Sequence, residues 1–169
     1  MTNADDEPVL TAEIRAWIGR EGPEESAEVT QREIERYAYA VGNLSPLFLD
    51  EAVAADSPFG GLVAPFQFYS IPFIDPLPHA ALKEDGIAAA GAGALRPPIP
   101  LPRTMAGGQE VEYARPIRPG DVLTRRSRIS DIDERPGSTG PLVFTTTETT
   151  YRDAAGEVVV VVRSTSISR

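Results

Sequence analysis

Few side chains in this sequence could act as a general base or a nucleophile at neutral pH. His79 is the only histidine, and the ordinary pKa of an imidazole makes it a candidate base. The chain has no cysteine, which excludes a thiol nucleophile and any zinc or iron–sulfur site ligated by cysteine. A single histidine also excludes a metal site built on a histidine pair. We therefore expect no metal and no bound cofactor.

Other polar residues have structural explanations beside the functional ones. His79 lies in the proline-rich stretch 76–80, where an exposed loop histidine is an ordinary finding. Tyr69 could point its hydroxyl into a pocket, or it could be a core tyrosine whose hydroxyl is hydrogen-bonded. Asp50 and Glu51 favour the start of a helix over a catalytic dyad, because acidic side chains stabilise helix N-termini. Tyr69 and His79 remain the two candidates for acid–base chemistry.

Charge and composition limit the classes of partner. The 169 residues carry a formal net charge of −9. A protein this acidic lacks the basic surface that nucleic acids bind, and it should repel anionic membranes. Residues 1–9 do not resemble a signal peptide, and the apolar run 59–74 contains two prolines and is too short to span a bilayer. We expect a cytoplasmic protein that binds neither nucleic acid nor membrane.

The length fits one domain with a substantial core. We predict a disordered N-terminus at 1–9 and a single domain at 10–169. Within this domain, residues 75–104 are rich in Pro, Ala and Gly, which is typical of an insertion or a lid.

The first half of the domain has helical signals. Thr30 and Glu33 form a capping box, an apolar stripe follows at helical spacing, and Gly42 ends the helix. A shorter helix is expected after Thr11, and a turn, a short helix and a turn at 43–63. The apolar run 64–71 predicts a buried central helix that ends near Pro72.

The last third has strand signals. Four Thr- and Val-rich runs lie at 109–113, 121–132, 142–152 and 157–167, separated by turns at 118–120, 135–137 and 153–156. The sequence therefore predicts an α+β fold, in which a long central helix is wrapped by a curved antiparallel sheet and preceded by an N-terminal helix. Because such a sheet has exposed edges, pairing with a second copy or another subunit is expected.

Three motifs occur in a distinctive order. Residues 41–50 read Val-Gly-Asn-Leu-Ser-Pro-Leu-Phe-Leu-Asp, and residues 59–65 read Phe-Gly-Gly-Leu-Val-Ala-Pro. Residues 108–113 read Gly-Gln-Glu-Val-Glu-Tyr, and Arg-Pro and Pro-Gly-Asp follow within eight residues. With this spacing the chain resembles the MaoC-like hydratase/dehydratase family, and in particular its N-terminal-type dehydratase domain, over about residues 10–169.

The resemblance implies a hot-dog fold that usually works as a pair of hot dogs. The family hydrates 2-enoyl thioesters or dehydrates (R)-3-hydroxyacyl thioesters, carried on CoA or on acyl carrier protein. An Asp and a His hold and deprotonate a water, and a backbone N–H at the start of the central helix polarises the thioester carbonyl. No cofactor is implied beyond the substrate's own carrier.

The catalytic turn departs from the family pattern. Asn43 stands where the family has Asp, and Phe48 stands where it has His; neither side chain can act as a base. Ser45 replaces the Asn of the motif, while the backbone donor could persist at Phe66. By resemblance, the substrate-binding positions are Ser45, Asp50, Phe59, Gly61, Phe66, Tyr69 and Phe73.

Three functions follow from this departure. The chain could be the non-catalytic, substrate-binding half of a two-subunit enzyme, paired with a catalytic MaoC-like subunit. It could be a homodimeric enzyme repurposed for another reaction, such as an isomerase or cyclase, with the base relocated to His79 or Tyr69. It could also be a non-enzymatic acyl-binding module. Arg125, Arg126 and Arg128 could contact a phosphate of the carrier, but a surface strand with salt bridges is the preferred explanation.

Overall fold

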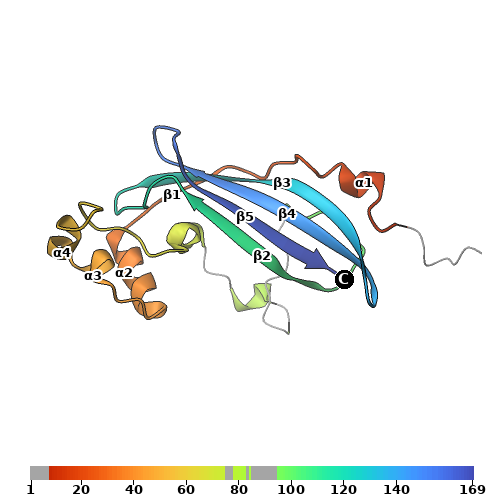
Figure 1. Ribbon diagram of the computed structural model, residues 1–169, viewed down its shortest axis with the longest axis horizontal. Coiled ribbons are helices and arrows are strands. Elements are labelled where there is room, and N and C mark those ends of the chain that lie inside the picture. The colour runs from red at the N-terminus through yellow and green to blue at the C-terminus, as the bar shows by residue number, and fades with distance from the viewer. Residues whose placement is uncertain (1–7, 75–77, 83, 85–94) are drawn as a thin grey trace, which may run out of the picture.

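The computed structural model describes residues 8–74, 78–82, 84 and 95–169 (Figure 1). In this part of the chain a five-stranded antiparallel sheet has the order β1-β3-β4-β5-β2. The strands are β1 Glu25–Glu28, β2 Thr104–Tyr113, β3 Val122–Gly137, β4 Gly140–Arg152 and β5 Val158–Ser168. The helices are α1 Ala12–Arg15, α2 Gln31–Ala40, α3 Pro46–Leu49 and α4 Glu51–Ala55, with the 3₁₀ helices η1 Phe68–Phe73 and η2 His79–Ala81. The predicted α+β class is confirmed.

Side chains along the strands alternate between the two faces of the sheet, with register shifts at 106–108, 129–131 and 151–152, so that one face packs against the helices and the other faces solvent. Across β2, β5 and β4, the side chains of Tyr113, Val160 and Tyr151 form one row of the inner face. Along β4, Val143, Thr145 and Tyr151 are buried and lie on this inner face.

Two hydrophobic clusters cover different ends of the sheet. The first joins α2 and η1 to the sheet and consists of Val29, Ile34, Phe68, Tyr69, Ile117, Leu123, Tyr151, Val159, Val160 and Val162. The second joins α1 to the opposite end and consists of Leu10, Ile14, Ile129, Ile132 and Val143. Figure 1 shows the corresponding separation, with α2, α3 and α4 at one end and α1 at the other. No helix among the described residues is long and apolar enough to cross a membrane.

The helix after Thr30 is confirmed with both of its predicted ends. The Thr30 hydroxyl accepts from the Glu33 N–H at 3.2 Å, and the Glu33 carboxylate accepts from the Thr30 N–H at 3.1 Å. Gly42, with φ of 70°, follows the C-cap in the left-handed conformation that the end of the helix requires. This helix ends directly before the turn that carries Asn43.

The predicted long central helix at 64–71 is wrong in its extent and its type. The helix in this region is η1, a 3₁₀ helix of six residues that starts at Phe68 and contains Pro72. Gln67, with φ of 69°, has a left-handed backbone that ends any helical run from Pro65. A 3₁₀ turn also tolerates Pro72, because the chain closes in short turns without a continuous i to i−4 ladder. The start of this element is therefore a turn, not a helix N-terminus.

Two further expectations are corrected or only partly covered. Pro136 and Gly137 belong to β3, and the hairpin turns after them, because β3 and β4 stay paired to the last residue before the two-residue loop. Of the predicted insertion 75–104, residues 75–77, 83 and 85–94 lie outside the described residues. Its last residue, Thr104, already belongs to β2. Of the predicted disordered segment 1–9, only Pro8 and Val9 are described, and the Val9 N–H donates to Glu134.

Candidate functional site

An open apolar groove of about 440 Å³ lies where α3 meets the end of β2. Its walls come from α3, from the segment after α4 and from the connection between β2 and β3. The residues that line it are Leu47, Phe48, Phe59, Val63, Ala64, Pro65, Phe66, Tyr113, Ala114, Arg115, Pro116 and Ile117. An apolar wall with few polar groups is the usual character of a site for a small, largely hydrophobic ligand.

Backbone hydrogen bonds hold the walls of the groove together. The Val63 N–H donates to the Leu47 carbonyl at 3.2 Å, and the Ala64 N–H donates to the Ile117 carbonyl at 2.8 Å. Ser45 caps α3 by accepting from the Leu47 N–H at 3.4 Å. The groove is thus fixed by contacts among three segments that are distant in sequence.

An ion-pair network braces the connection between β2 and β3. The Arg115 guanidinium donates to both carboxylate oxygens of Asp121, at 2.8 and 3.0 Å, and to Asp153 at 3.2 Å. The hydrogen bond to Asp121 is the largest of the effects that raise the pKa of Arg115. Arg118 donates to the Phe59 carbonyl and so ties this connection to the opposite wall. Arg115 is therefore a cation throughout the neutral range and is occupied by two carboxylates.

The turn at Phe66 and Gln67 forms one lip of the groove. Gln67 is the only non-glycine residue with positive φ in the described part of the chain, and such a backbone costs on the order of 1–3 kcal/mol. Its N–H donates to the Tyr113 hydroxyl oxygen at 3.3 Å. The rings of Phe66 and Tyr113 lie against each other with centroids 5.2 Å apart. Tyr113 therefore supports a strained turn from across the groove.

The tyrosines near the groove keep their protons at neutral pH, so their hydroxyls can donate hydrogen bonds. Burial raises the pKa of Tyr113 to about 12, against a smaller opposite effect of the Gln67 N–H. Burial also raises the pKa of Tyr151 to about 12 and that of Tyr69 above its usual value. The Tyr69 hydroxyl donates to Gln109 at 2.9 Å. A hydroxyl with a raised pKa remains neutral at pH 7 and is a poor base.

The positions expected from the sequence fall into two groups. Phe48, Phe59 and Phe66 line the groove, and Gly61 is close to it, since a Cβ there would lie 3.4 Å from the Arg118 guanidinium. The others are not among its lining residues. Asn43 is exposed after α2, and Asp50 caps α4 by accepting from the N–H groups of Ala52 and Val53.

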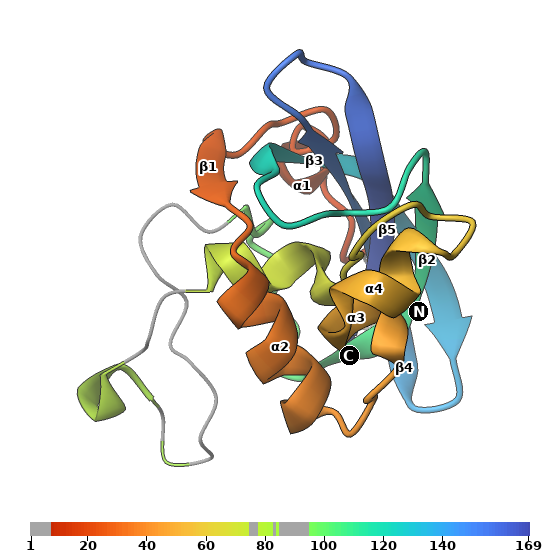
Figure 2. The same cartoon turned by 90° about the vertical axis from the view of Figure 1, so that its left-hand side faces the viewer.

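Three further expected residues lie in other surroundings. Tyr69 is buried in the first cluster. Phe73 meets the Tyr151 ring edge-on and lies under the Arg125 guanidinium at 4.6 Å. His79 is exposed on η2, which stands apart from the other helices in both ribbon views (Figures 1 and 2). Neither candidate for relocated chemistry is among the residues that line the groove.

Sequence reasoning missed Tyr113, Arg115 and Ile117 as groove residues. Tyr113 is the last residue of the motif at 108–113 and the other two follow it; this motif was used to recognise the family but not to assign a role. Their position at the end of β2 opposite α3 depends on tertiary packing, which the motif does not encode.

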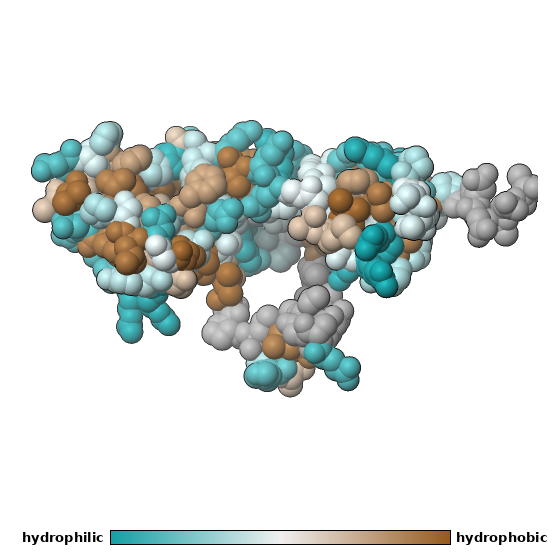
Figure 3. All heavy atoms as spheres, turned by 60° about the horizontal axis from the view of Figure 1, so that its bottom comes forward, coloured by the Kyte–Doolittle hydropathy of each residue, from teal (hydrophilic) through white to brown (hydrophobic). Residues whose placement is uncertain are grey.

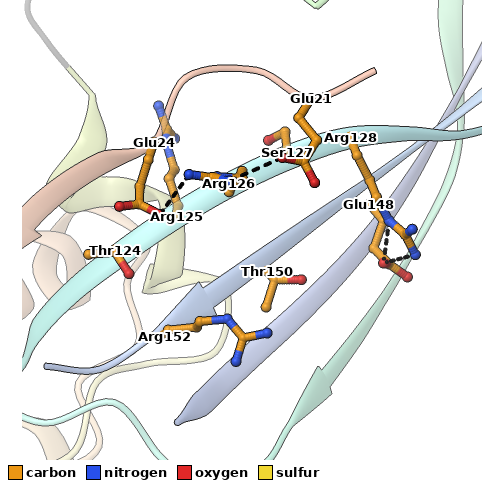
Figure 4. Close-up of a pocket in the computed structure, with 10 residues that line it drawn as sticks. All are labelled: Glu21, Glu24, Thr124, Arg125, Arg126, Ser127, Arg128, Glu148, Thr150 and Arg152. Atoms are coloured by element: carbon orange, nitrogen blue, oxygen red, sulfur yellow. Dashed lines mark hydrogen bonds and ion pairs between the residues drawn. The ribbon is translucent and has the colours of Figure 1, made fainter. Parts of the chain in front are cut away.

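A second hollow, a cleft of about 390 Å³, lies on the outer face of β3 and β4 (Figure 4). Arg126 pairs with Glu21 at 3.1 Å and with Glu24 at 3.2 Å, and Arg128 pairs with Glu148 at 2.8 Å. Arginines that already have carboxylate partners are poorly suited to bind a phosphate. The expected salt-bridged strand surface is therefore what the structure shows. Among the described residues, no three Asp, Glu or His side chains lie close enough to hold a metal ion.

Comparison with known proteins shows which family this chain matches. The chain matches the model of the family described as FAS1-like, dehydratase domain region, over residues 16–162. It is 33% identical over 136 residues to the mesaconyl-C(4)-CoA hydratase of Chloroflexus aurantiacus, an overlap of 80% of this chain and 44% of that enzyme. It is also 33% identical over 150 residues to a UPF0336 protein of Thermobifida fusca, covering 86% of this chain and 87% of that protein. The chain thus spans less than half of the first relative and most of the second.

Solved structures show the same fold. A MaoC-like dehydratase from Rhodospirillum rubrum superimposes with a TM-score of 0.59 and 22% identity, covering 89% of this chain and 91% of that one. A C-terminally truncated HadBC (3R-hydroxyacyl-ACP dehydratase) complex from Mycobacterium tuberculosis gives a TM-score of 0.64 with 21% identity, covering 90% and 97%. These likenesses confirm the predicted hot-dog fold.

Proposed function

We propose, from the premise that this chain belongs to the FAS1-like dehydratase family of MaoC-like proteins, that it is the substrate-binding half of a two-subunit enzyme. The enzyme would hydrate 2-enoyl thioesters or dehydrate (R)-3-hydroxyacyl thioesters. This chain would hold the acyl thioester, and a partner with an intact Asp-x-Asn-Pro-x-His turn would supply the Asp and the His. The substrate would be carried on CoA or on acyl carrier protein.

One observation carries the proposal: the groove has a place for an acyl group but no base. Among the described residues, its lining contains no carboxylate and no imidazole. Its two ionisable residues are Arg115, which is paired with Asp121 and Asp153, and Tyr113, whose pKa is raised to about 12 by burial. Phe48, at the position of the family histidine, forms part of the apolar wall. A hydration needs a group that can take a proton from water near neutral pH, and neither residue can.

The surface of the chain supports a partner subunit. β2 is an edge strand of the sheet among the described residues, and an exposed edge is commonly covered by another chain. Several large apolar side chains are exposed on the helical end of the molecule (left in Figure 3), including Tyr39, Val41, Leu44 and Phe66. Exposed apolar patches of this kind mark protein interfaces. The HadBC structure is itself a complex, and the Chloroflexus relative is more than twice as long as its matched segment.

The test is a hydration assay with crotonyl-CoA, in which the reaction is monitored by the loss of the enoyl absorbance. The chain alone should give no rate above the uncatalysed reaction, while butyryl-CoA should bind to it. Addition of a MaoC-like subunit with the intact catalytic turn should produce hydration. A normal rate from the chain alone would contradict the proposal and move the search to His79 and Tyr69.

A matched variant separates binding from catalysis in this assay. Phe48→Asp places a charge in the apolar wall and should abolish butyryl-CoA binding and the activity of the complex. Ile18→Asp, at an exposed position just after α1, at the end of the molecule opposite the groove, should change neither. If the chain binds butyryl-CoA but no such partner yields hydration, the function is that of an acyl-binding module.

A further inference from the structure

Two hydrogen-bond donors meet at the lip of the groove. The Phe66 N–H has no acceptor among the described residues. The next residue, Gln67, donates its N–H to the Tyr113 hydroxyl, so Tyr113 stands within one peptide unit of the Phe66 N–H. Both Phe66 and Tyr113 line the groove. A carbonyl oxygen placed at this lip could meet both donors.

The hydrogen bonding of Tyr113 leaves its own proton available. In the described part of the chain, the hydroxyl oxygen accepts from Gln67 and the O–H has no acceptor. A hydroxyl that accepts one hydrogen bond donates the next one more strongly, because the two bonds polarise each other. Burial raises the pKa of Tyr113 to about 12, which keeps this proton in place across the neutral range.

We infer that the Tyr113 hydroxyl is a second hydrogen-bond donor to the thioester carbonyl, acting beside the Phe66 N–H. The arrangement is a chain from the Gln67 N–H to the Tyr113 oxygen and from the Tyr113 O–H to the substrate oxygen. Two donors aimed at one oxygen stabilise the charge that develops there when the enolate forms. The inference rests on the proposed function, since it needs an acyl thioester in the groove.

Ring packing alone does not explain why residue 113 is a tyrosine and not a phenylalanine. The Tyr113 ring lies against Phe66 at 5.2 Å and near Tyr69 at 6.5 Å, and a phenylalanine would keep both contacts. The hydroxyl does support the strained Gln67 turn, so a purely structural role has to be separated from a binding role. This separation requires a ligand that differs only at the carbonyl.

The experiment compares butyryl-CoA with S-butyl-CoA, its thioether counterpart without the carbonyl, by calorimetric titration of the full chain. Tyr113→Phe should weaken butyryl-CoA binding about five- to tenfold, the usual effect of one lost hydrogen bond. It should leave S-butyl-CoA binding unchanged. Tyr151→Phe removes a hydroxyl from a buried position that is not part of the groove lining and should affect neither ligand.

Repeating the comparison in a variant with a relaxed Gln67 turn removes the structural role of the Tyr113 hydroxyl. Glycine adopts positive φ without strain, so Gln67→Gly makes the turn independent of Tyr113. Tyr113→Phe added to Gln67→Gly should still weaken only butyryl-CoA. Equal weakening of both ligands, or no weakening in either background, overturns the inference while leaving the proposed function standing. If the unmodified chain binds neither ligand, the proposed function fails and this inference fails with it.

Discussion

The apolar groove and the outer cleft have similar volumes, about 440 and 390 Å³, and opposite chemistry. Within the described part of the chain, Arg115 is the single charged residue in the lining of the groove, whereas seven of the ten residues that line the cleft are charged. In the cleft the guanidiniums of Arg126 and Arg128 are paired with carboxylates. In the groove the Phe66 N–H and the Tyr113 O–H have no acceptor in the described part of the chain.

For these two hollows, hydrogen-bond donors without an acceptor are therefore a better guide to a binding site than volume or charge. The paired charges of the cleft gain little from a ligand, because each new contact displaces an existing one. Arg152 also lines the cleft, and its guanidinium donates to the Gly156 carbonyl and not to a carboxylate. A groove with apolar walls and free donors gains both burial and hydrogen bonds. The two regions should therefore respond differently to substitution, to pH and to salt.

The largest expected difference is between the floors of the two hollows. Ile117 lines the groove, is 2% exposed and belongs to the first hydrophobic cluster. Ile117→Ala should lower the free energy of unfolding by about 3 kcal/mol, from lost burial and the cavity left behind. Thr150→Ala, in the cleft, should change it by less than about 0.5 kcal/mol. Urea unfolding measures both, and equal effects would show that the groove is not built on the core.

The ion pairs around Arg115 should matter more than those of the cleft. Arg115 makes a bidentate contact with Asp121 and a third contact with Asp153, and its loss leaves two carboxylates without that partner. Because about a third of the side chain is exposed, Arg115→Ala should cost only about 1–2 kcal/mol. Arg126→Ala, at an exposed pair, should cost less than about 0.5 kcal/mol.

A charge-preserving variant refines the Arg115 measurement. Arg115→Lys keeps the cation but cannot reproduce the bidentate contact, so its unfolding free energy should lie between those of the unmodified chain and Arg115→Ala. If Arg115→Ala and Arg126→Ala lower the free energy of unfolding by the same amount, the ion-pair network around Arg115 does not stabilise the groove.

Local signals in the sequence predicted much of this fold. The Thr30–Glu33 capping box, the Gly42 helix end and the strand run at 142–152 each depend on neighbouring residues, and the structure shows all three. The expectation that Phe66 lies at the substrate site, and that Phe48 occupies the position of the family histidine, came from the family resemblance. Their place in one apolar wall agrees with it, although binding itself stays a prediction.

The parts of the fold and of the groove that the sequence did not predict depend on contacts between residues far apart in the chain. The run 64–71 has helical composition, but the left-handed Gln67 backbone is supported by Tyr113 from another strand. A hydrogen bond between residues 46 positions apart leaves no local pattern. The same reason hid the role of Tyr113, which was visible only as the last residue of a recognition motif.

High pH should weaken the groove end of the molecule. Burial raises the pKa of Tyr113 and Tyr151 to about 12, above the usual 10.0. A raised pKa means that the folded state holds the proton longer than the unfolded state, so the stabilisation is complete below pH 10 and is lost as the pH rises toward 12. By pH 11 we expect a loss of about 1 kcal/mol per tyrosine after allowance for solvent screening.

Urea unfolding at pH 9, 10 and 11 measures this loss. Tyr151→Phe removes one of the two groups without touching the groove lining, so its stability should fall less steeply above pH 10. An unchanged slope in this variant would mean that burial does not hold the Tyr151 proton.

Low pH should weaken the outer face, by the smallest amount. The hydrogen bond from Arg128 is the largest of the effects that lower the pKa of Glu148 below its usual 4.5, and Arg163 adds to it against the effect of burial. A lowered pKa means that the stabilisation is present above pH 4.5 and is lost as the pH falls through the folded-state value. For partly exposed pairs this should amount to less than about 1 kcal/mol.

The acid effect should also depend on salt, which separates it from the groove. Glu148→Gln should flatten the stability curve between pH 5 and pH 3, measured by urea unfolding, and raising the ionic strength should flatten it in the unmodified chain as well, because exposed pairs are screened. Butyryl-CoA binding should not follow this curve, since no residue of the cleft lines the groove. A loss of binding that parallels the titration of Glu148 would instead connect the two faces of the sheet, and the contrast between a satisfied cleft and an unsatisfied groove would no longer hold.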